Sequence, residues 1–227
     1  GAAIDAGAGA DLASVASARA FAGALRAAGV DSVDALVFAS GVVSAPLSAG
    51  RTVEGYDLNV GVNAVGPLAL ALGALDLVRA ARGRVVLVGS TAALDVPPST
   101  AFLDDLAYNT SRPHAPRAAY AESKALGVLL VDELARREEE LGTGVTANVI
   151  HPGPAATLAV RYELPARYEQ RLGMSEEQLA QQARRLGLRT ADEAAAGPEW
   201  LAASAEAAGA TGEFFVDAGV PLPAEYA

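Results

Sequence analysis

The sequence predicts an α/β fold in which a doubly wound parallel sheet is covered by helices on both faces. Short apolar runs alternate with longer helical patterns along the chain. The apolar runs are hydrophobic at consecutive positions, as strands buried on both faces are. Several runs end in Gly, Ser or Pro, as strands do where they enter loops. The length of 227 residues, 52% of them hydrophobic, fits a single domain over residues 1–227.

The N-terminal part predicts a helix followed by a strand. Residues 11–29 are rich in alanine, carry Leu and Phe at helical spacing, and stop at a glycine. Ser14 is a possible N-cap for this helix. Residues 34–41, "DALVFASG", form a short apolar run that ends in small residues, as a buried strand does.

A second helix and strand follow. Residues 52–82 have a helical pattern, which Asn63, Gly66 and Pro67 are expected to kink. Residues 83–90, "GRVVLVGS", are a β-branched run between glycines and give the clearest strand in the chain.

The middle of the chain predicts a loop, a long helix and a third strand. Residues 91–117 hold four prolines and the polar stretch "YNTSRPHAPR", so they predict a long loop. Residues 118–141 have a helical pattern that ends at Gly142. Residues 144–150 are a buried strand that stops at "HPGP".

The C-terminal part predicts two helices and a last strand. Residues 175–187 open with Ser175 and Gln178 at capping-box spacing, which marks the start of a helix. A second helical pattern covers residues 191–204, and "GEFFVD" at 212–217 predicts the final strand.

Composition excludes several kinds of partner. Seventeen basic and 27 acidic residues give a net charge of −10, which repels nucleic acid and anionic lipid surfaces. The chain has no cysteine, so disulfides and thiolate metal sites are excluded, and we assign no metal ligand. No uninterrupted apolar run reaches the roughly 18 residues of a membrane span. We therefore expect a cytoplasmic protein without a membrane span.

The only lysine of the chain lies four residues after a tyrosine, in "YAESK". On a helix, Tyr120 and Lys124 share one face, one turn apart. A phenol has an ordinary pKa near 10, and an adjacent cation favours its phenolate form. The pair can therefore give and take a proton, and the ammonium can also donate to a ligand hydroxyl. The alternative is an ordinary surface pair at helical spacing.

Other polar residues follow the strands. Ligands of parallel α/β sheets bind beyond the carboxyl ends of the strands, where Ser90 would bring a hydroxyl to the edge that the Tyr120 helix approaches. Such a hydroxyl can hold a carbonyl oxygen. Asn63 is a polar residue inside an apolar stretch and needs a partner. Its alternative reading is a buried amide that satisfies a kinked helix.

Five stretches, in this order, resemble the short-chain dehydrogenase/reductase family: "DALVFASGVV", "GVNAVGPLAL", "GRVVLVGS", "YAESK" and "GVTANVIHPGPAAT". The resemblance implies a Rossmann-like fold and an NAD(P)-dependent oxidoreductase. It also implies a catalytic tetrad. Tyr120 is its general acid/base and Ser90 holds the carbonyl. Lys124 tunes the phenol and binds the ribose, and Asn63 anchors a relay water.

The resemblance also implies a set of residues that bind the cofactor. They are Asp11 and Leu12 near the adenine, Ser40 and Gly41, Tyr120 and Lys124, and Pro152, Gly153 and Thr157 near the nicotinamide. The spacing from Ser90 to Tyr120 and the C-terminal stretch look like the branch of retinol dehydrogenases and protochlorophyllide reductases. That branch favours NADP over NAD and an apolar carbonyl or alcohol substrate. Residues 155–190 would be the substrate lid, although core packing explains at least half of its aromatic residues.

Two features depart from the family pattern. The asparagine-rich turn of the family reads Phe38, Ala39, Ser40 and Gly41 here, and the glycine-rich loop that anchors the pyrophosphate is absent. "DAGAGAD" at 5–11 follows no buried strand and is expected to be a loop. The resemblance thus implies a fold truncated at its N-terminus, with the first two strand-helix units missing. The strand at 34–38 would then present an unpaired edge.

Three functional hypotheses remain. The first is an NAD(P)-dependent oxidoreductase, either incomplete in this sequence or completed by a second chain or a homo-oligomer. The second is a non-catalytic binding or oligomerisation module that has lost cofactor binding; the intact tetrad argues against it. The third is a truncated relic without activity. Substrate identity cannot be read from the residues.

Overall fold

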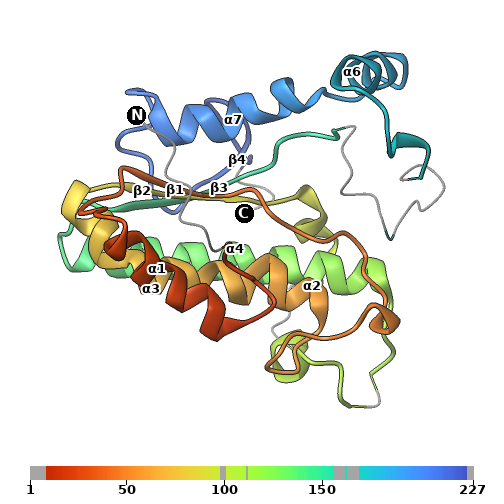
Figure 1. Cartoon of the computed structure of the whole chain (residues 1–227), viewed down its shortest axis with the longest axis horizontal. Helices are drawn as coiled ribbons and strands as arrows, with labels where there is room; N and C mark the ends of the chain where they lie inside the picture. The colour runs from red at the N-terminus through yellow and green to blue at the C-terminus, as the bar shows by residue number, and fades with distance from the viewer. Residues whose placement is uncertain (1–8, 98–100, 111, 156–161, 163–168, 224–227) are drawn as a thin grey trace.

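A five-stranded sheet with helices on both faces forms the centre of the protein (Figure 1). In order across the sheet, its strands are β1 (Ala35–Phe38), β2 (Arg84–Val88), β3 (Thr146–Ile150), β4 (Phe214–Asp217) and β5 (Val220–Pro221). The first four are parallel, which confirms the predicted doubly wound sheet. The fifth pairs antiparallel with β4. The sequence analysis missed β5 because two residues carry no periodicity; a turn with Gly219 at φ 68° makes this hairpin possible.

The computed structural model describes residues 9–97, 101–110, 112–155, 162 and 169–223. Three helices cover one face of the sheet: α1 (Val15–Ala27), α3 (Gly66–Ala81) and α4 (Pro116–Glu140). On the opposite face lies α7 (Ala191–Ala203), and α6 (Glu176–Arg185) lies beyond its N-terminal end (Figure 1). All of these helices were predicted; the boundaries of α1, α4, α6 and α7 differ by up to four residues, and the start of the helix that contains α3 differs by more.

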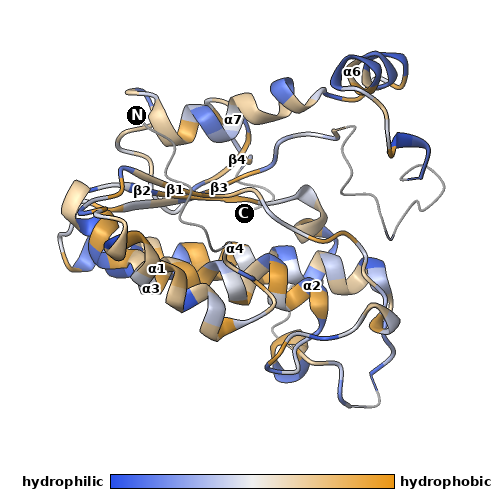
Figure 2. Cartoon of the chain, in the orientation of Figure 1, coloured by the Kyte–Doolittle hydropathy of each residue, from blue (hydrophilic) through white to orange (hydrophobic). Residues whose placement is uncertain are grey.

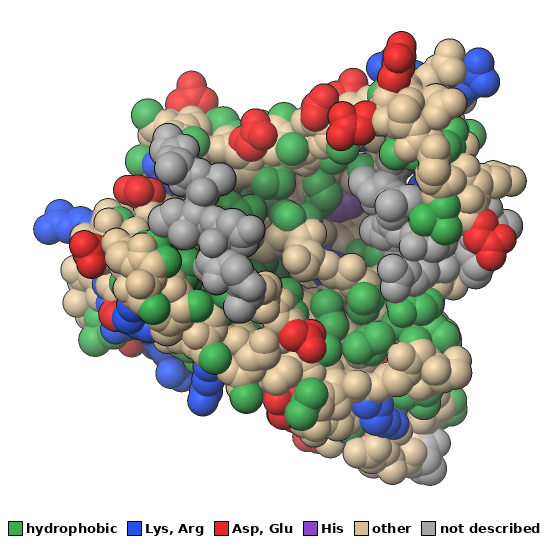
Figure 3. All heavy atoms as spheres, in the orientation of Figure 1, with side chains coloured by type: hydrophobic (Ala, Val, Ile, Leu, Met, Phe, Trp, Pro, Cys, Tyr) green, Lys and Arg blue, Asp and Glu red, His purple; other side chains and the backbone are tan. Residues whose placement is uncertain are grey.

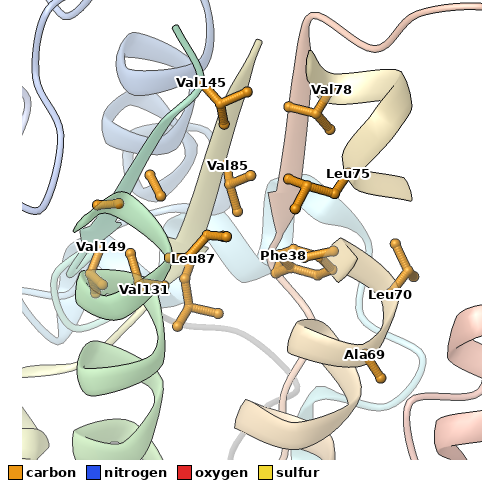
Figure 4. Close-up of a cluster of buried hydrophobic side chains, with 14 of the residues drawn as sticks. Phe38, Ala69, Leu70, Leu75, Val78, Val85, Leu87, Val131, Val145 and Val149 are labelled. Carbon is orange, nitrogen blue, oxygen red and sulfur yellow. The ribbon is translucent and has the colours of Figure 1, made fainter. Parts of the chain in front are cut away.

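Each face of the sheet has its own apolar core. Between the sheet and α1, α3 and α4, the buried cluster includes Phe38, Leu70, Val85, Val131 and Val149 (Figure 4). Apolar residues of these helices face the sheet and polar residues face outward (Figure 2). Under α7, a smaller cluster is formed by Val86, Ile150, Leu201, Ala207 and Phe215. Because β1 to β4 run parallel, the loops that follow their carboxyl ends lie together at one end of the sheet.

The helix predicted over residues 52–82 begins later than expected. Gly55 adopts φ 88°, so a turn precedes Asp57, whose carboxylate caps the helix by accepting from the N–H groups of Asn59 and Val60. A short α2 (Leu58–Val60) then leads into a π-helical turn, η2 (Gly61–Val65), before α3. Pro67 has no N–H and cannot bond to the carbonyl of Asn63, which favours this wider turn. The predicted local distortion is therefore confirmed, but the start at residue 52 was wrong.

The predicted loop over residues 91–117 contains short helical turns. These are η3 (Thr91–Asp95) and η4 (Ala101–Asp105); a third, η1 (Leu47–Ala49), lies between β1 and α2. The long helix α4 begins at Pro116 rather than at 118. Proline is well suited to the first turn of a helix because its missing N–H would have no helical partner there.

The strand β1 lies at one edge of the sheet. Among the described residues it pairs only with β2, and its other edge carries unpaired backbone groups. Val37, within this apolar strand, is 41% exposed and lines the cavity described below. Within the described part of the chain, this edge of β1 is open, as expected, and an open edge can pair with another strand.

One helical stretch, Leu58–Ala81, is long and apolar enough by composition to cross a membrane, with a mean hydropathy of 1.6. In the fold, 67% of this apolar window is buried. Nine residues of α3 pack inside the protein, and the helix contacts both α1 and the sheet. The composition of this stretch therefore suits its place as a core helix.

Gly66 marks a close contact between α3 and the N-terminal segment. A Cβ atom on Gly66 would lie 2.3 Å from the backbone oxygen of Leu12. Because a backbone oxygen cannot move away easily, we expect Gly66→Ala to lower the free energy of unfolding by about 2 kcal/mol, as overpacking does. Urea denaturation measures this change.

Gly23 provides the control for this substitution. It is exposed within α1, and nothing lies within 4 Å of an added Cβ. Gly23→Ala is therefore expected to raise the free energy of unfolding by about 0.5–1 kcal/mol through helix propensity alone. Equal effects of the two substitutions would contradict the close contact at Gly66.

Candidate active site

A cavity of about 840 Å³ opens at the carboxyl ends of β1, β2 and β3, between the sheet and α7. Figure 3 shows this face of the molecule hollowed between the sheet layer and the α7 layer, with acidic side chains along α7. Seven predicted site residues line the cavity: Ser40, Gly41, Ser90, Tyr120, Lys124, Pro152 and Gly153. They come from four segments that are far apart in the sequence and that the parallel sheet brings together.

Lys124 lies in the wall of the cavity and is 7% exposed. Its ammonium donates to the carbonyl oxygen of Val88, at the end of β2, at 2.9 Å. The same nitrogen lies 5.7 Å from the centre of the Tyr120 ring. Burial lowers the pKa of Lys124 to about 8. The site therefore holds a cation beside the phenol, and this cation can lose its proton in mildly basic solution.

Tyr120 and Ser90 lie in the wall of the same cavity, and both are half-buried. Ser90 is the N-cap of η3, and its Oγ accepts from the N–H of Ala92 at 3.2 Å. Accepting this bond leaves the hydroxyl proton of Ser90 available for a ligand oxygen. A carbonyl oxygen in the cavity could thus meet a donor from the β2 loop and a phenol from α4.

The side chain of Asn63 joins two walls of the site. Its Oδ1 accepts from the N–H of Val42 at 2.8 Å, and its Nδ2 donates to the Val42 oxygen at 2.9 Å. The same Nδ2 donates to Ser123 Oγ at 2.9 Å, and Ser123 Oγ donates to the backbone carbonyl oxygen of Tyr120 at 2.6 Å. The amide donors are thus fully used by the protein. This is the buried amide of a distorted helix that the sequence analysis kept as an alternative; the relay water remains a prediction.

The turn after β1 fits closely against these residues. A Cβ atom on Gly41 would lie 3.0 Å from Asn63 Oδ1 and 3.9 Å from Lys124 Nζ. The turn lacks the asparagine of the family. Two hydrogen bonds between Asn63 and Val42, one in each direction, hold the backbone just after the turn. A residue without a side chain at position 41 also leaves room for a flat ligand.

The loop after β3 forms another wall. Gly153 has φ 78°, a conformation that favours glycine. His151 lines the cavity, and burial, together with the charges of Arg189 and Lys124, lowers the pKa of its imidazole. Its Nδ1 is buried and has no hydrogen-bond partner among the described residues.

Sequence reasoning missed Arg189 at this loop. Its Nη1 donates to the oxygen of Pro152 at 3.0 Å, and its guanidinium pairs with Asp217. The pairing lowers the pKa of the Asp217 carboxyl. The only signal in the sequence is that Arg189 directly precedes Thr190, which begins a capping box with Glu193. Nothing in that pattern indicates that the arginine turns back to the β3 loop.

The structure does not bring every predicted residue to the cavity. Asp11 caps the turn before α1 by accepting from the N–H of Ala13, and Leu12 packs against the core. Neither lines the cavity, and their expected contact with an adenine remains a prediction. Thr157 lies outside the described residues. Of the expected lid over residues 155–190, residues 156–161 and 163–168 also lie outside them.

The described residues fit one half of a nicotinamide dinucleotide. The glycines at 41 and 153 line the cavity without side chains, and two further N–H groups of Lys124 can serve ribose hydroxyls. The pyrophosphate half lacks its usual partner, because no Gly-x-Gly-x-x-Gly turn joins a strand to a helix in the described part of the chain. Where such a cofactor binds, Tyr120, Lys124, Ser40, Gly41, Pro152 and Gly153 would hold its nicotinamide end.

The chain is similar to known dehydrogenases. Human retinol dehydrogenase 13 is 38% identical over 148 residues, 65% of this chain and 42% of that protein. Dehydrogenase/reductase SDR family member 13 of Bos taurus is 38% identical over 145 residues, 63% of this chain and 36% of that protein. The chain thus spans less than half the length of these relatives. No protein-family model matches it.

The fold has relatives among solved structures. A short chain dehydrogenase from Burkholderia cenocepacia in complex with NADP matches with a TM-score of 0.60 and 24% identity, covering 93% of this chain and 74% of that one. The mostly parallel sheet with helices on both faces and the cavity at the carboxyl ends of its strands define a protein of the Rossmann-like α/β class. Within that class, the chain belongs to the short-chain dehydrogenase/reductase family, on its retinol dehydrogenase-like branch.

Proposed function

We propose that this chain carries the catalytic centre of an NAD(P)-dependent oxidoreductase that acts on an apolar carbonyl compound or the corresponding alcohol. The observation that carries the proposal is the buried Lys124 beside Tyr120, in the wall of a cavity that Ser90 also lines. Burying a lysine costs free energy. If its charge had no function, replacing Lys124 with an apolar residue would raise the stability of the fold.

Each side chain has a defined task in carbonyl reduction. Ser90 donates a hydrogen bond to the carbonyl oxygen and holds it near Tyr120. Tyr120 gives its phenolic proton to that oxygen as negative charge develops there. The Lys124 ammonium stabilises the phenolate that remains, and the carbonyl of Val88 fixes the position of the ammonium. A bound nicotinamide cofactor supplies or accepts the hydride at the carbonyl carbon.

The cavity wall supports an apolar substrate. Away from the polar end, the wall is made of small apolar side chains, among them Val37, Val43, Ala194, Ala195 and Pro198. Such a surface binds hydrocarbon by burial, although Asp95, Arg117 and Glu199 also line the cavity. For the cofactor, we propose NADP or NAD, with NADP slightly favoured by the resemblance to the retinol dehydrogenase branch; solved structures of similar fold carry NADP in some cases and NAD in another.

One observation favours a second candidate function, a binding or oligomerisation module. The open edge of β1 can accept a strand from another chain, and the cavity begins at the same strand. In this alternative, the cavity is part of an interface and no cofactor binds.

Titration with NADPH and NADH, followed by the fluorescence of the reduced nicotinamide, separates the two functions. The oxidoreductase predicts saturable binding, and turnover when an aliphatic or isoprenoid aldehyde is added. No saturation up to millimolar cofactor would exclude catalysis by this chain alone. Sedimentation of the same sample would then show whether the chain forms a stable dimer, as the alternative requires.

A further inference from the structure

We propose that Arg189 is a positioning residue that clamps the Pro152–Gly153–Pro154 turn against the cavity and thereby sets the affinity for the nicotinamide end of the cofactor. The inference rests on the proposed function where it concerns the cofactor. The clamp itself rests on contacts within the chain.

Two contacts tie Arg189 to the turn, one through its side chain and one through its backbone, and the backbone contact is part of a short bridge. Its Nη1 donates to the oxygen of Pro152 at 3.0 Å. Its backbone N–H donates to the oxygen of Pro154 at 2.8 Å. Ala155 and Arg189 form an isolated parallel bridge. Ala155, at the end of the turn, and Arg189, 34 residues later, therefore lie side by side.

The side chain also fills the space under the turn. A Cβ atom on Gly153 would lie 2.8 Å from Arg189 Nε, 2.9 Å from Cδ and 3.0 Å from Cζ. The guanidinium thus packs directly against the Gly153 backbone, on the side where any other residue would carry its side chain. With φ 78° at Gly153, the turn depends on a glycine for its backbone and on Arg189 for its support.

Asp217 fixes the clamp from the far side. Its carboxylate accepts hydrogen bonds from both terminal nitrogens of Arg189. Nη1 lies 3.4 Å from Oδ1, and Nη2 lies closer to Oδ2. Asp217 is the last residue of β4, and its Oδ1 also accepts from the N–H of Ala218. A paired, planar guanidinium loses little freedom when it holds a backbone oxygen, so the fork positions the turn better than a lysine would.

The position of the turn matters because Pro152 and Gly153 line the same cavity as Tyr120 and Lys124. A displacement of about 1 Å in a residue that positions a ligand is enough to cost large factors in binding or rate. Arg189 does not line the cavity, so its effect passes through the turn.

Arg189→Met tests the clamp, because methionine keeps the aliphatic bulk and removes the fork. Hydrogen exchange at the backbone amide of residue 189, which donates to the Pro154 oxygen, should become at least about tenfold faster, since this bond opens more often once the side chain no longer holds the turn. The Kd for NADPH should rise by about tenfold, as for a lost charge-assisted hydrogen bond, while kcat at saturation stays within about twofold. Arg189→Lys should restore part of the affinity.

Arg84 offers a matched control. Its Nη1 donates to the oxygens of Leu201 and Ser204 at 2.9 and 2.8 Å, so it also clamps α7, but at the opposite end of the sheet from the cavity. Arg84→Met is expected to lower stability and to leave both the exchange of the turn and the Kd for NADPH unchanged. Should Arg189→Met fail to fold, Asp217→Asn tests the same clamp, because it removes the carboxylate charge that holds the fork.

Different results would contradict the clamp of Arg189 on the turn and the effect of Arg189 on cofactor affinity. Unchanged exchange in the turn of Arg189→Met would overturn the clamp, whether or not a cofactor binds. Faster exchange with an unchanged Kd for NADPH would overturn its role toward the cofactor. Absence of NADPH binding by the unmodified chain would overturn the proposed function, and hydrogen exchange would still decide the clamp.

Discussion

Tyr120→Phe lowers kcat by about 10²- to 10⁴-fold and leaves the Kd for the cofactor nearly unchanged, if the proposed chemistry is right. The substitution removes one oxygen from a half-buried ring in the cavity wall and keeps the ring itself. Proton transfer to the substrate oxygen then lacks its donor, while the surfaces that hold a cofactor stay in place. Steady-state rates with saturating cofactor, together with fluorescence titration, measure the two quantities separately.

Tyr108→Phe is the control for this substitution. The Tyr108 hydroxyl donates to Glu122 at 2.6 Å, and the residue does not line the cavity. Its loss is expected to weaken a buried hydrogen bond and so to lower stability by about 1 kcal/mol, with kcat unchanged. If Tyr120→Phe keeps full kcat, or weakens cofactor binding as much as it slows turnover, the role given to Tyr120 is wrong.

Lys124→Met is expected to show a second large effect, on both rate and stability. Removing the cation beside the phenol leaves the phenolate without its counter-charge, so kcat should fall by about 10²-fold or more. The same substitution removes a buried ammonium group. Burial lowers the pKa of this group from 10.5 to about 8. A shift of this size corresponds to about 3 kcal/mol of stability lost while the amine is charged.

The dependence of stability on pH follows from this shift. Below pH 8 the amine is charged in both states, and the folded state bears the cost of burial. Between pH 8 and 10.5 the unfolded chain binds more protons than the folded one, so stability rises with pH. Above 10.5 the cost is gone. Urea unfolding of the unmodified protein and of Lys124→Met from pH 7 to 10.5 should show the unmodified protein gaining on the variant in this window. A constant difference would contradict the buried, titrating amine.

The elements could be predicted from the sequence wherever a local pattern decides them. The run "GRVVLVGS" became β2 because β-branched residues between glycines leave few alternatives. Ser175 and Gln178 marked α6 because their capping bonds are local. The predicted helix start at residue 52 was wrong. The apolar spacing there resembles a helix, but the turn at Gly55 and the N-cap at Asp57 delay the start of the helix.

The site could be predicted where the motif itself spans one helix. Tyr120 and Lys124 lie one turn apart on α4, and their common face follows from helical geometry. Contacts that depend on the fold could not be predicted. The bonds of Asn63 to Val42 cross 21 residues, and the pairing of Arg189 with Asp217 crosses 28. No periodicity connects such positions; only the packing of the strands brings them together.

The chain has a single lysine, and that lysine lies in the cavity wall. The extent to which an amine reagent labels Lys124 therefore measures whether a molecule occupies the cavity. Apart from the terminal amine, an aldehyde or active ester has one target. With a pKa of about 8, a large share of that amine is uncharged and nucleophilic in mildly alkaline buffer. Protection of position 124 against such a reagent, followed by mass spectrometry, would therefore report any molecule that fills the cavity, including one that undergoes no reaction.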